Sequence, residues 1–136
     1  MSIISNTSVI RFSANIATIS FAVVIIIQLL LAAGVIPVSM AWGGRQEVLT
    51  PNLRVTSIVS AVVLCLFAYI IRRRAGLMGP VEISTIIKVL AWIVTAYMAF
   101  NTFTNLISQS SAEMMIFAPI TAVLTVVCFI VSISRQ

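Results

Sequence analysis

Four long stretches without a charged residue constrain this chain more than any other feature of its sequence. They cover residues 12–44, 55–71, 89–112 and 114–134, and each is rich in isoleucine, valine, leucine, phenylalanine and alanine. About 20 apolar residues in a helix cross the hydrocarbon core of a bilayer. A segment in lipid must satisfy its backbone hydrogen bonds internally, so each stretch is expected to be helical. The sequence therefore predicts an all-α integral membrane protein, a four-helix bundle.

Local signals place the ends of the four helices. The expected spans are about 13–36, 51–72, 80–106 and 111–134, within one transmembrane domain that comprises residues 1–136. Gly34 and Pro37 are expected to close the first helix, and Thr50 is a suitable N-cap for the second. The third is expected to begin at Pro80. Ser110 and Glu113 have the spacing of a capping box at the start of the fourth.

The composition excludes a soluble domain. Charged residues make up only 8% of the 136 residues and hydrophobic residues 61%, whereas soluble domains have about 25% charged residues. The net charge is +5. In a chain this apolar, the basic excess is expected to face anionic lipid head groups rather than nucleic acid. Membrane lipids are the expected partners, and no nucleic-acid partner is expected.

The basic residues are distributed unevenly over the predicted loops. One side of the membrane would carry Arg11, the run 72–74, Lys88 and Arg135, and the other side only Arg45 and Arg54. Loops rich in arginine and lysine stay in the cytoplasm. The protein is therefore expected to be multi-pass, with both termini cytoplasmic.

The residues of most catalytic and metal sites are scarce. The sequence has no histidine or aspartate, and its carboxylates are Glu47, Glu82 and Glu113. Cys65 and Cys128 lie in different predicted helices, where each is expected to be a buried packing residue. We therefore expect no metal site, no cofactor and no carboxylate pair for acid–base catalysis, and so no enzyme.

A polar cluster is expected where the second and fourth helices begin, on the outer side. Because a charge at the membrane edge is costly unless paired, Arg54 and Glu113 should lie within ion-pair or one-water distance, with Glu47 as the competing partner of Arg54. Such a cluster is either a pin between two helices or a vestibule that accepts a solute or proton. Its other candidate members are Asn105, Ser108, Ser110 and the outer-loop residues Trp42, Gly43, Gly44, Arg45 and Glu47.

Two further features lie inside the predicted helices. Gln28 is an amide deep in the first apolar stretch, where it is expected to hydrogen-bond between helices or to contact a ligand or ion. Pro119 is expected to kink the fourth helix and to free a backbone carbonyl near Met115. Each helix also carries a stripe of small or weakly polar residues, as expected at helix contacts in lipid.

Several short motifs are distributed over most of the chain from about residue 30 onward. They are 41–44 (AWGG), 53–54 (LR) with Ser57, 74–77 (RAGL), and 105–108 (NLIS) with Ser110, Glu113 and Pro119. Together they resemble a family of small bacterial four-helix integral membrane proteins of uncharacterised activity. The resemblance implies a bacterial inner-membrane location and nothing about mechanism. The chain departs from the family at Gln109, where members often carry a basic residue.

Two functions of different class follow from these features. The first is a non-enzymatic small inner-membrane protein that acts through helix packing, as a homo-oligomer or as a partner in a larger membrane complex. The second is a small transporter or channel with a polar outer vestibule around Glu113 and Arg54. Small multidrug transporters are of similar size and helix count. Their membrane-embedded glutamate in the first helix is missing here, where Gln28 is the nearest polar residue, and this counts against membership. A cavity that reaches Glu113 and Gln28 would favour the second function.

Overall fold

A computed structural model describes residues 5–135, which contain four long α-helices and no strand. The helical elements are α1 (Thr7–Ala33), η2 (Val38–Met40), η3 (Trp42–Gly44), α2 (Pro51–Arg74), α3 (Thr85–Leu106), η4 (Glu113–Phe117) and α4 (Ala118–Ser132). Here η2 and η3 are 3₁₀ turns, and η4 is a π turn that leads directly into α4. Four spans, with η4 and α4 counted together, are long and apolar enough to cross a membrane. The all-helical class and the four candidate spans are therefore confirmed.

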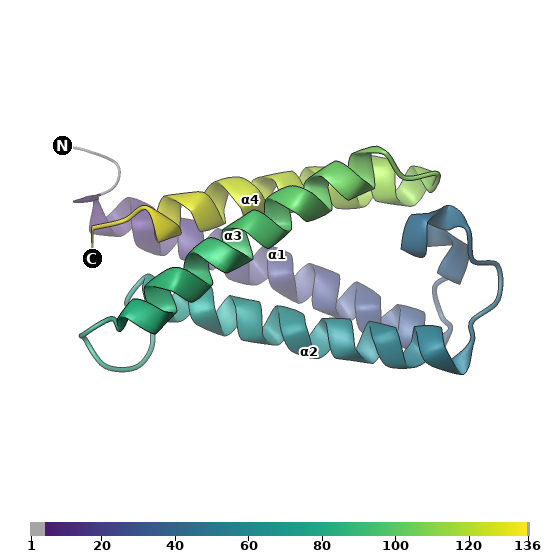
Figure 1. The fold of residues 1–136 in the computed structure, drawn as a ribbon, viewed down its shortest axis with the longest axis horizontal. Helices are drawn as coiled ribbons and strands as arrows, with labels where there is room; N and C mark the ends of the chain where they lie inside the picture. The colour runs from purple at the N-terminus through teal and green to yellow at the C-terminus, as the bar shows by residue number, and fades with distance from the viewer. Residues whose placement is uncertain (1–4, 136) are drawn as a thin grey trace.

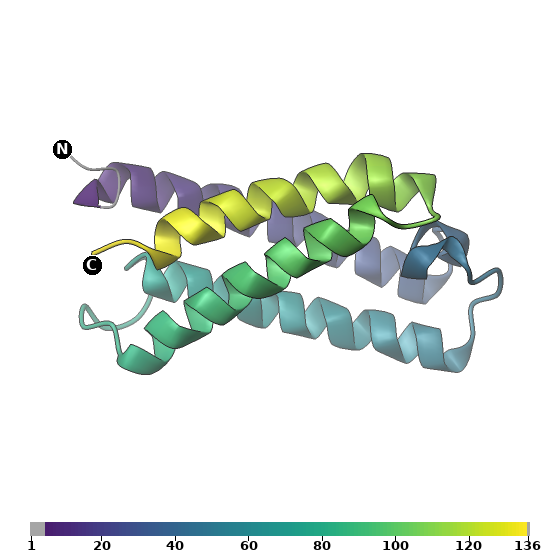
Figure 2. The same ribbon diagram turned by 45° about the horizontal axis from the view of Figure 1, so that its top comes forward.

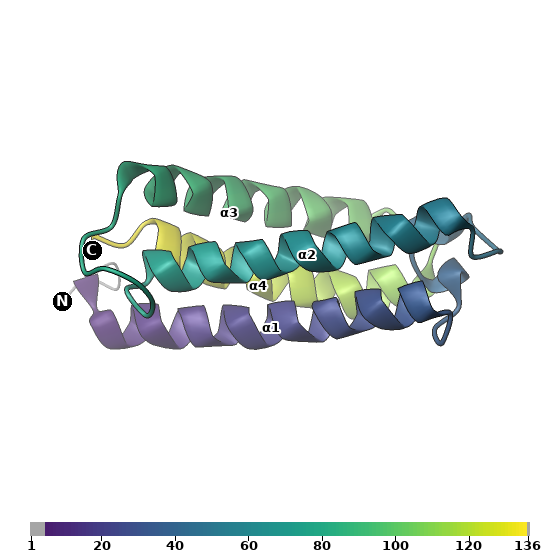
Figure 3. The same ribbon diagram turned by 90° about the horizontal axis from the view of Figure 1, so that it is seen from below.

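The helices form two hairpins that pack side by side. α1 runs along α2, α3 runs along α4, and α1 also packs against α4. One end of the bundle holds the start of α1, the end of α4 and the α2–α3 connection (Figure 1), and we call it the basic end because it carries Arg11, the run 72–74 and Lys88. The α1–α2 loop and the α3–α4 turn lie at the other end, which we call the loop end. Figure 3 shows the alternating directions of the helices.

Of the helices that follow one another in the chain, α2 and α3 are the least closely packed. They make few contacts. Figure 1 shows that they diverge toward the loop end, and Figure 2 shows α3 crossing α2 at an angle. The buried hydrophobic core follows this divergence. Its residues on the four helices, from Ile10 to Val24, Leu64 to Ile71, Ala91 to Met98 and Leu124 to Val131, extend from the basic end to a little beyond the middle of the bundle. Other apolar residues, among them Leu31 and Val38, are buried nearer the loop end but lie outside this cluster.

α1 begins about two turns before the predicted residue 13. Its N-cap is Asn6, whose side chain accepts a hydrogen bond from the backbone N–H of Val9 at 3.2 Å. Arg11 does not interrupt the helix because its side chain is exposed. The helix ends at Ala33 rather than at residue 36. As predicted, Gly34 ends it, in a left-handed conformation with φ 80° that glycine adopts without steric cost.

α2 matches its prediction closely. The Thr50 hydroxyl accepts from the Leu53 N–H at 3.2 Å and so caps the helix. α2 extends to Arg74, two residues past the predicted end. Of the two cysteines, Cys128 is buried as expected, but Cys65 on α2 is exposed, so the expectation of a packing role for it is wrong.

α3 begins at Thr85 and not at Pro80. The guanidinium of Arg73, at the end of α2, donates to the backbone carbonyls of Met78, Pro80 and Glu82 at 3.0–3.1 Å. The segment 78–82 therefore wraps around this side chain and does not wind into a helix. Ser84 caps α3 instead, through a hydrogen bond from the Ile87 N–H at 3.4 Å.

Two other arginines also bind the C-terminal end of α2 to neighbouring helices. Arg74 is buried and donates to the carbonyls of Ser132 and Ser134 at the end of α4. Arg72 donates to the side chains of Asn15 and Thr18 on α1, each at 3.1 Å. The basic end is thus closed by guanidinium groups that bind the α2–α3 connection, side chains of α1 and the carbonyls at the end of α4.

Candidate functional site: a cleft at the loop end

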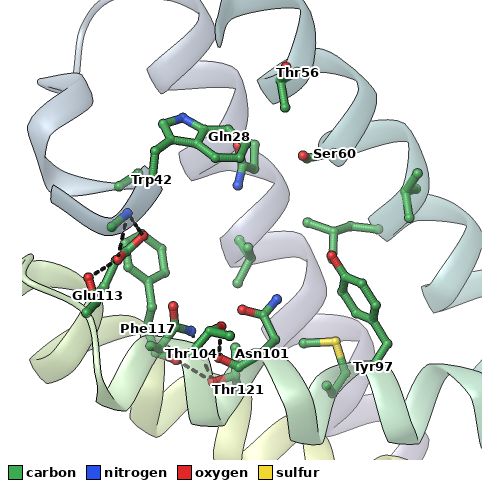
Figure 4. Close-up of a pocket in the computed structure, with 18 of the residues that line it drawn as sticks. Gln28, Trp42, Thr56, Ser60, Tyr97, Asn101, Thr104, Glu113, Phe117 and Thr121 are labelled. Atoms are coloured by element: carbon green, nitrogen blue, oxygen red, sulfur yellow. Dashed lines mark hydrogen bonds between the residues drawn. The ribbon is translucent and has the colours of Figure 1, made fainter. Parts of the chain in front are cut away.

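A cleft with a volume of about 850 Å³ begins where the hydrophobic core stops. Val24, Leu64, Met98 and Leu124 belong both to the core and to the cleft wall. The other walls come from the diverging halves of α2 and α3, from η4 and from the α1–α2 loop (Figure 4). The same divergence that ends the core therefore creates the cavity.

The cleft wall is amphipathic. Its apolar part includes Val55, Val59, Val63, Phe67 and Phe117. The polar part is made almost entirely of amides and hydroxyls, with one carboxylate and one guanidinium. These polar residues are Gln28, Trp42, Arg45, Thr56, Ser60, Tyr97, Asn101, Thr104, Asn105, Ser108, Gln109, Glu113 and Thr121.

Glu113 joins three segments at the rim of the cleft. Its two carboxylate oxygens accept from the backbone N–H of Gly43 at 3.2 and 3.1 Å, and one of them also accepts from the Ser108 hydroxyl. The carboxylate therefore holds η3 of the α1–α2 loop against the α3–α4 turn. The structure brings together Glu113, Ser108 and Gly43, as predicted for the outer cluster.

Ser110 makes a second connection between the same segments. Its hydroxyl accepts from the Glu113 N–H at 3.3 Å, as predicted for the N-cap, and donates to the Met40 carbonyl at 3.0 Å. The return half of the predicted capping box is not formed, because the Glu113 carboxylate binds Gly43 and Ser108 instead. A Cβ on Gly44 would lie only 2.8 Å from the Ser110 nitrogen, which shows how tightly loop and turn are packed.

The irregularity expected next to Pro119 takes the form of the π turn η4. The N–H of Ala118 bonds to the carbonyl of Glu113, five residues earlier, and the proline that follows has no N–H to donate. The extra residue in this turn changes the angle between Glu113 and the rest of α4. π turns occur frequently at functional sites.

Asn105 holds α3 to α4 beneath the cleft. It is buried, and its amide donates to the Thr121 hydroxyl at 3.4 Å. Asn101, Thr104 and Tyr97 line the cleft on the same helix (Figure 4). Of these only Asn105 is predicted from the sequence. The spacing of four residues between Tyr97, Asn101 and Asn105 is the signal that identifies the rest, since it places them on one helix face.

Gln28 and Trp42 each carry a buried polar atom without a hydrogen-bond partner. These are Gln28 Oε1 and Trp42 Nε1, and both residues line the cleft. Gln28 therefore forms no interhelical hydrogen bond through this oxygen. Trp42 has a positive φ of 56°, the only such value for a non-glycine residue in the described chain. Strained backbone of this kind clusters at binding and catalytic sites.

Arg54 does not join the cluster. Its side chain is exposed and does not line the cleft, and no direct ion pair with Glu113 forms within residues 5–135. Of the two forms predicted for this contact, the direct ion pair is therefore wrong: donors in the two loops occupy the Glu113 carboxylate, while α2 diverges from the α3–α4 hairpin at this end. Contact through one water stays a prediction. Arg45 lines the cleft in its place, and Glu47 is exposed.

The part of the chain that the structure describes holds no group of three or more His, Cys, Asp or Glu residues able to bind a metal ion. Comparison with protein-family models, with curated proteins and with solved structures finds no match for this chain. The chemistry of the cleft is therefore the basis for assigning a function.

Proposed function

We propose that this protein is a small multi-pass membrane protein that binds an amphipathic molecule in the cleft and does not convert it. The observation that carries the proposal is a cavity of about 850 Å³ that reaches both Glu113 and Gln28. Its volume falls within the range of roughly 300–1,000 Å³ found for small-molecule sites. A dry, fully packed interior would instead have favoured a purely structural role.

The composition of the cleft wall supports an amphipathic ligand. Hydroxyl and amide groups from α1, α2 and α3 can bind a polar head, and valine and phenylalanine side chains can hold a hydrocarbon tail. Val55, Val59 and Tyr97 line the cleft and are about half exposed or more, so the cleft is open between α2 and α3. In a bilayer this flank would adjoin lipid tails, so a membrane-dissolved molecule would enter sideways between α2 and α3.

The distribution of charge supports an orientation. The basic end would face the cytoplasm, with both termini inside, because basic residues concentrate there. The cleft would then open in the outer leaflet, beneath the α1–α2 loop. The motif resemblance supports placing the protein in a bacterial inner membrane. A transporter that releases its substrate past this loop is one form of the proposed function, with Arg45 rather than Arg54 at the rim.

The state of the carboxylate supports binding rather than catalysis. Glu113 is the one carboxylate that lines the cleft, and the Gly43 N–H and the Ser108 hydroxyl already bind it. A general base must have its carboxylate aimed at the substrate, and these contacts instead aim the Glu113 oxygens at the α1–α2 loop and the α3–α4 turn. The role proposed for Glu113 is therefore to position the α1–α2 loop.

The two tryptophans allow a direct test of binding, because Trp42 lines the cleft and Trp92 lies on the outer face of α3. In Trp92→Phe protein in nanodiscs, Trp42 is the only tryptophan reporter. A dodecyl methyl ether and a dodecanol, each brominated at the chain end, should quench its fluorescence saturably. In the matched Trp42→Phe protein, quenching of Trp92 should rise linearly with the bromide content of the bilayer.

A cleft-filling pair of variants makes this test specific. In the Trp92→Phe background, Ser60→Phe on the cleft wall should abolish saturable quenching by both probes. Val62→Phe should retain it, since Val62 is exposed and does not line the cleft. If quenching of Trp42 rises only linearly in the unfilled protein, the cleft binds no amphiphile and the proposal fails.

A groove between α3 and α4 supports self-association as a second function. It has a volume of about 380 Å³ and is lined by Trp92, Thr95, Ala96, Ala99, Thr125, Val126 and Phe129. Ala96 and Ala99 leave room for a helix of a second copy to approach closely, as small residues do in membranes. Ala99→Phe should then lower the yield of crosslinked dimer in native membranes, and Val62→Phe should not. Equal yields of crosslinked dimer from both variants would contradict self-association through this groove. Packing against a different protein in a larger complex would then be the alternative.

A further inference from the structure

We propose that the cleft selects an uncharged amphiphile with a hydroxyl head group, which donates to Gln28 Oε1 and accepts from Trp42 Nε1. The inference rests on the proposed binding function and names the class of its ligand. A long-chain alcohol, a prenol or a glyceride has this chemistry.

The first support is the pair of unpartnered atoms. Gln28 Oε1 is an acceptor and Trp42 Nε1 is a donor, both are buried, and neither has a hydrogen-bond partner. A buried polar group without a partner is costly, so such groups in folded proteins are nearly always satisfied. Figure 4 shows both side chains at the same end of the cleft, away from Tyr97 and Asn101. A ligand that supplies one donor and one acceptor there satisfies both.

The second support is the way in which Trp42 is held. Its backbone has φ 56°, a conformation that non-glycine residues keep only when the surrounding contacts fix it. Those contacts are present on both sides of it. The following residue, Gly43, donates to the Glu113 carboxylate, and Ala41, which precedes it, is buried. These contacts therefore hold the loop in the conformation that places the indole in the cleft wall.

The charges around the cleft disfavour an ionic head group. An anionic head would face the Gln28 oxygen and the negative charge of Glu113, and Arg45 at the rim is exposed to solvent. A cationic head group such as an ammonium has no acceptor, so it would leave the Trp42 N–H without a partner. Among uncharged groups, a ketone, ester or ether accepts but cannot donate, and so would leave Gln28 Oε1 unpartnered. A hydroxyl both donates and accepts.

The test compares the two brominated probes, which differ only in the hydroxyl hydrogen that the ether replaces with a methyl group. In Trp92→Phe protein, the alcohol should reach half-saturation at a mole fraction about tenfold lower than the ether, because the ether leaves a buried acceptor unpaired. Gln28→Leu, which has similar volume and no acceptor, should bring this ratio to about one while leaving ether binding unchanged. Thr56→Val, on the opposite wall, should keep the ratio of the parent protein.

The outcomes separate the ligand class from the binding function. If both probes quench Trp42 saturably with equal half-saturation in the parent protein, the hydroxyl assignment is overturned and the proposed function stands. If neither probe quenches saturably, both are overturned. Should Gln28→Leu fail to fold, binding of radiolabelled dodecanol to Trp42→Phe protein tests the donor instead. Affinity equal to that of the parent would overturn the assignment.

Discussion

The two ends of this bundle differ in what their buried polar groups are available to bind. At the basic end, Arg73 donates to three backbone carbonyls, and Thr95 shares a 2.9 Å hydrogen bond with Ser132 between α3 and α4. Buried polar atoms without a partner occur at both ends, among them Ser134 Oγ at the basic end, but only those of Gln28 and Trp42 belong to residues that line the cleft. Stability and binding are thus separated along the helix axes, because a group already bonded to its own chain is not free for a ligand.

The difference has a simple geometric origin. The core includes small and apolar side chains of α2 and α3, and the two helices diverge toward the loop end. The divergence would leave an open slot if nothing covered it. The α1–α2 loop covers the slot, and Glu113 and Ser110 hold this loop in place. The loop end is therefore ordered by a few specific contacts rather than by a continuous core.

The largest effect is expected at the basic end. Arg73→Ala removes the donor for three loop carbonyls, and hydrogen bonds to charged donors each contribute about 1.5–3 kcal/mol. We expect the unfolding free energy in mixed micelles to fall by about 3 kcal/mol, with partial compensation by water. Arg135→Ala removes an exposed arginine from the same end and should leave the unfolding free energy unchanged. Equal losses in both variants would contradict the special role of Arg73.

A neighbouring pair of glycines measures how tightly the α1–α2 loop is packed. Both have positive φ, 77° at Gly43 and 74° at Gly44, but only at Gly44 would an added Cβ meet backbone, at 2.8 Å from the Ser110 nitrogen. Gly43→Ala should cost about 1 kcal/mol for the left-handed conformation alone. Gly44→Ala should cost about 2–3 kcal/mol, because the loop must also move. The difference between the two unfolding free energies measures the loop–turn contact, and a difference of zero would refute it.

A smaller, local effect is expected from Glu113→Gln. The amide can still accept from the Gly43 N–H, but the hydrogen bonds lose their charge assistance, which amounts to about 1 kcal/mol. Hydrogen exchange of the amides in residues 38–44 should quicken by about fivefold, while the amides of α2 near Arg73 stay unchanged. Glu47→Gln, an exposed carboxylate in the same loop, is the control and should change neither. Faster exchange at both ends would mean that the two ends are not independent.

The sequence predicts best the features set by neighbouring residues. The helix class, the number of spans, the Thr50 cap, the end at Gly34 and the Ser110 cap all depend on residues within a turn of each other. Apolar length and capping preferences are local properties. The start of α3 at Thr85 is not predicted, because it depends on the Arg73 side chain at the end of α2, which binds carbonyls of the connection up to nine residues later.

The candidate site was predictable only in part for the same reason. Glu113, Ser108, Asn105 and the α1–α2 loop are grouped correctly, because helix parity places them at one end. The partner of Glu113 is not predicted correctly. It is the backbone N–H of Gly43, seventy positions away in the chain, and a backbone N–H has no sequence signature. The positive φ of Trp42 could not be predicted from the sequence either, because tryptophan rarely adopts it.

The smallest expected effect separates the predicted partner of Glu113 from the observed one. Double-mutant cycles on unfolding free energy measure the coupling between two side chains. For Ser108→Ala with Glu113→Gln the coupling should be about 1 kcal/mol, since the hydroxyl donates directly to the carboxylate. For Arg54→Ala with Glu113→Gln it should be below about 0.3 kcal/mol, because an exposed arginine without a direct contact is screened by water and salt. A coupling near 1 kcal/mol for the arginine pair would restore the ion pair and place the start of α2 against η4. The cleft between α2 and the α3–α4 hairpin would then have to be narrower at its rim.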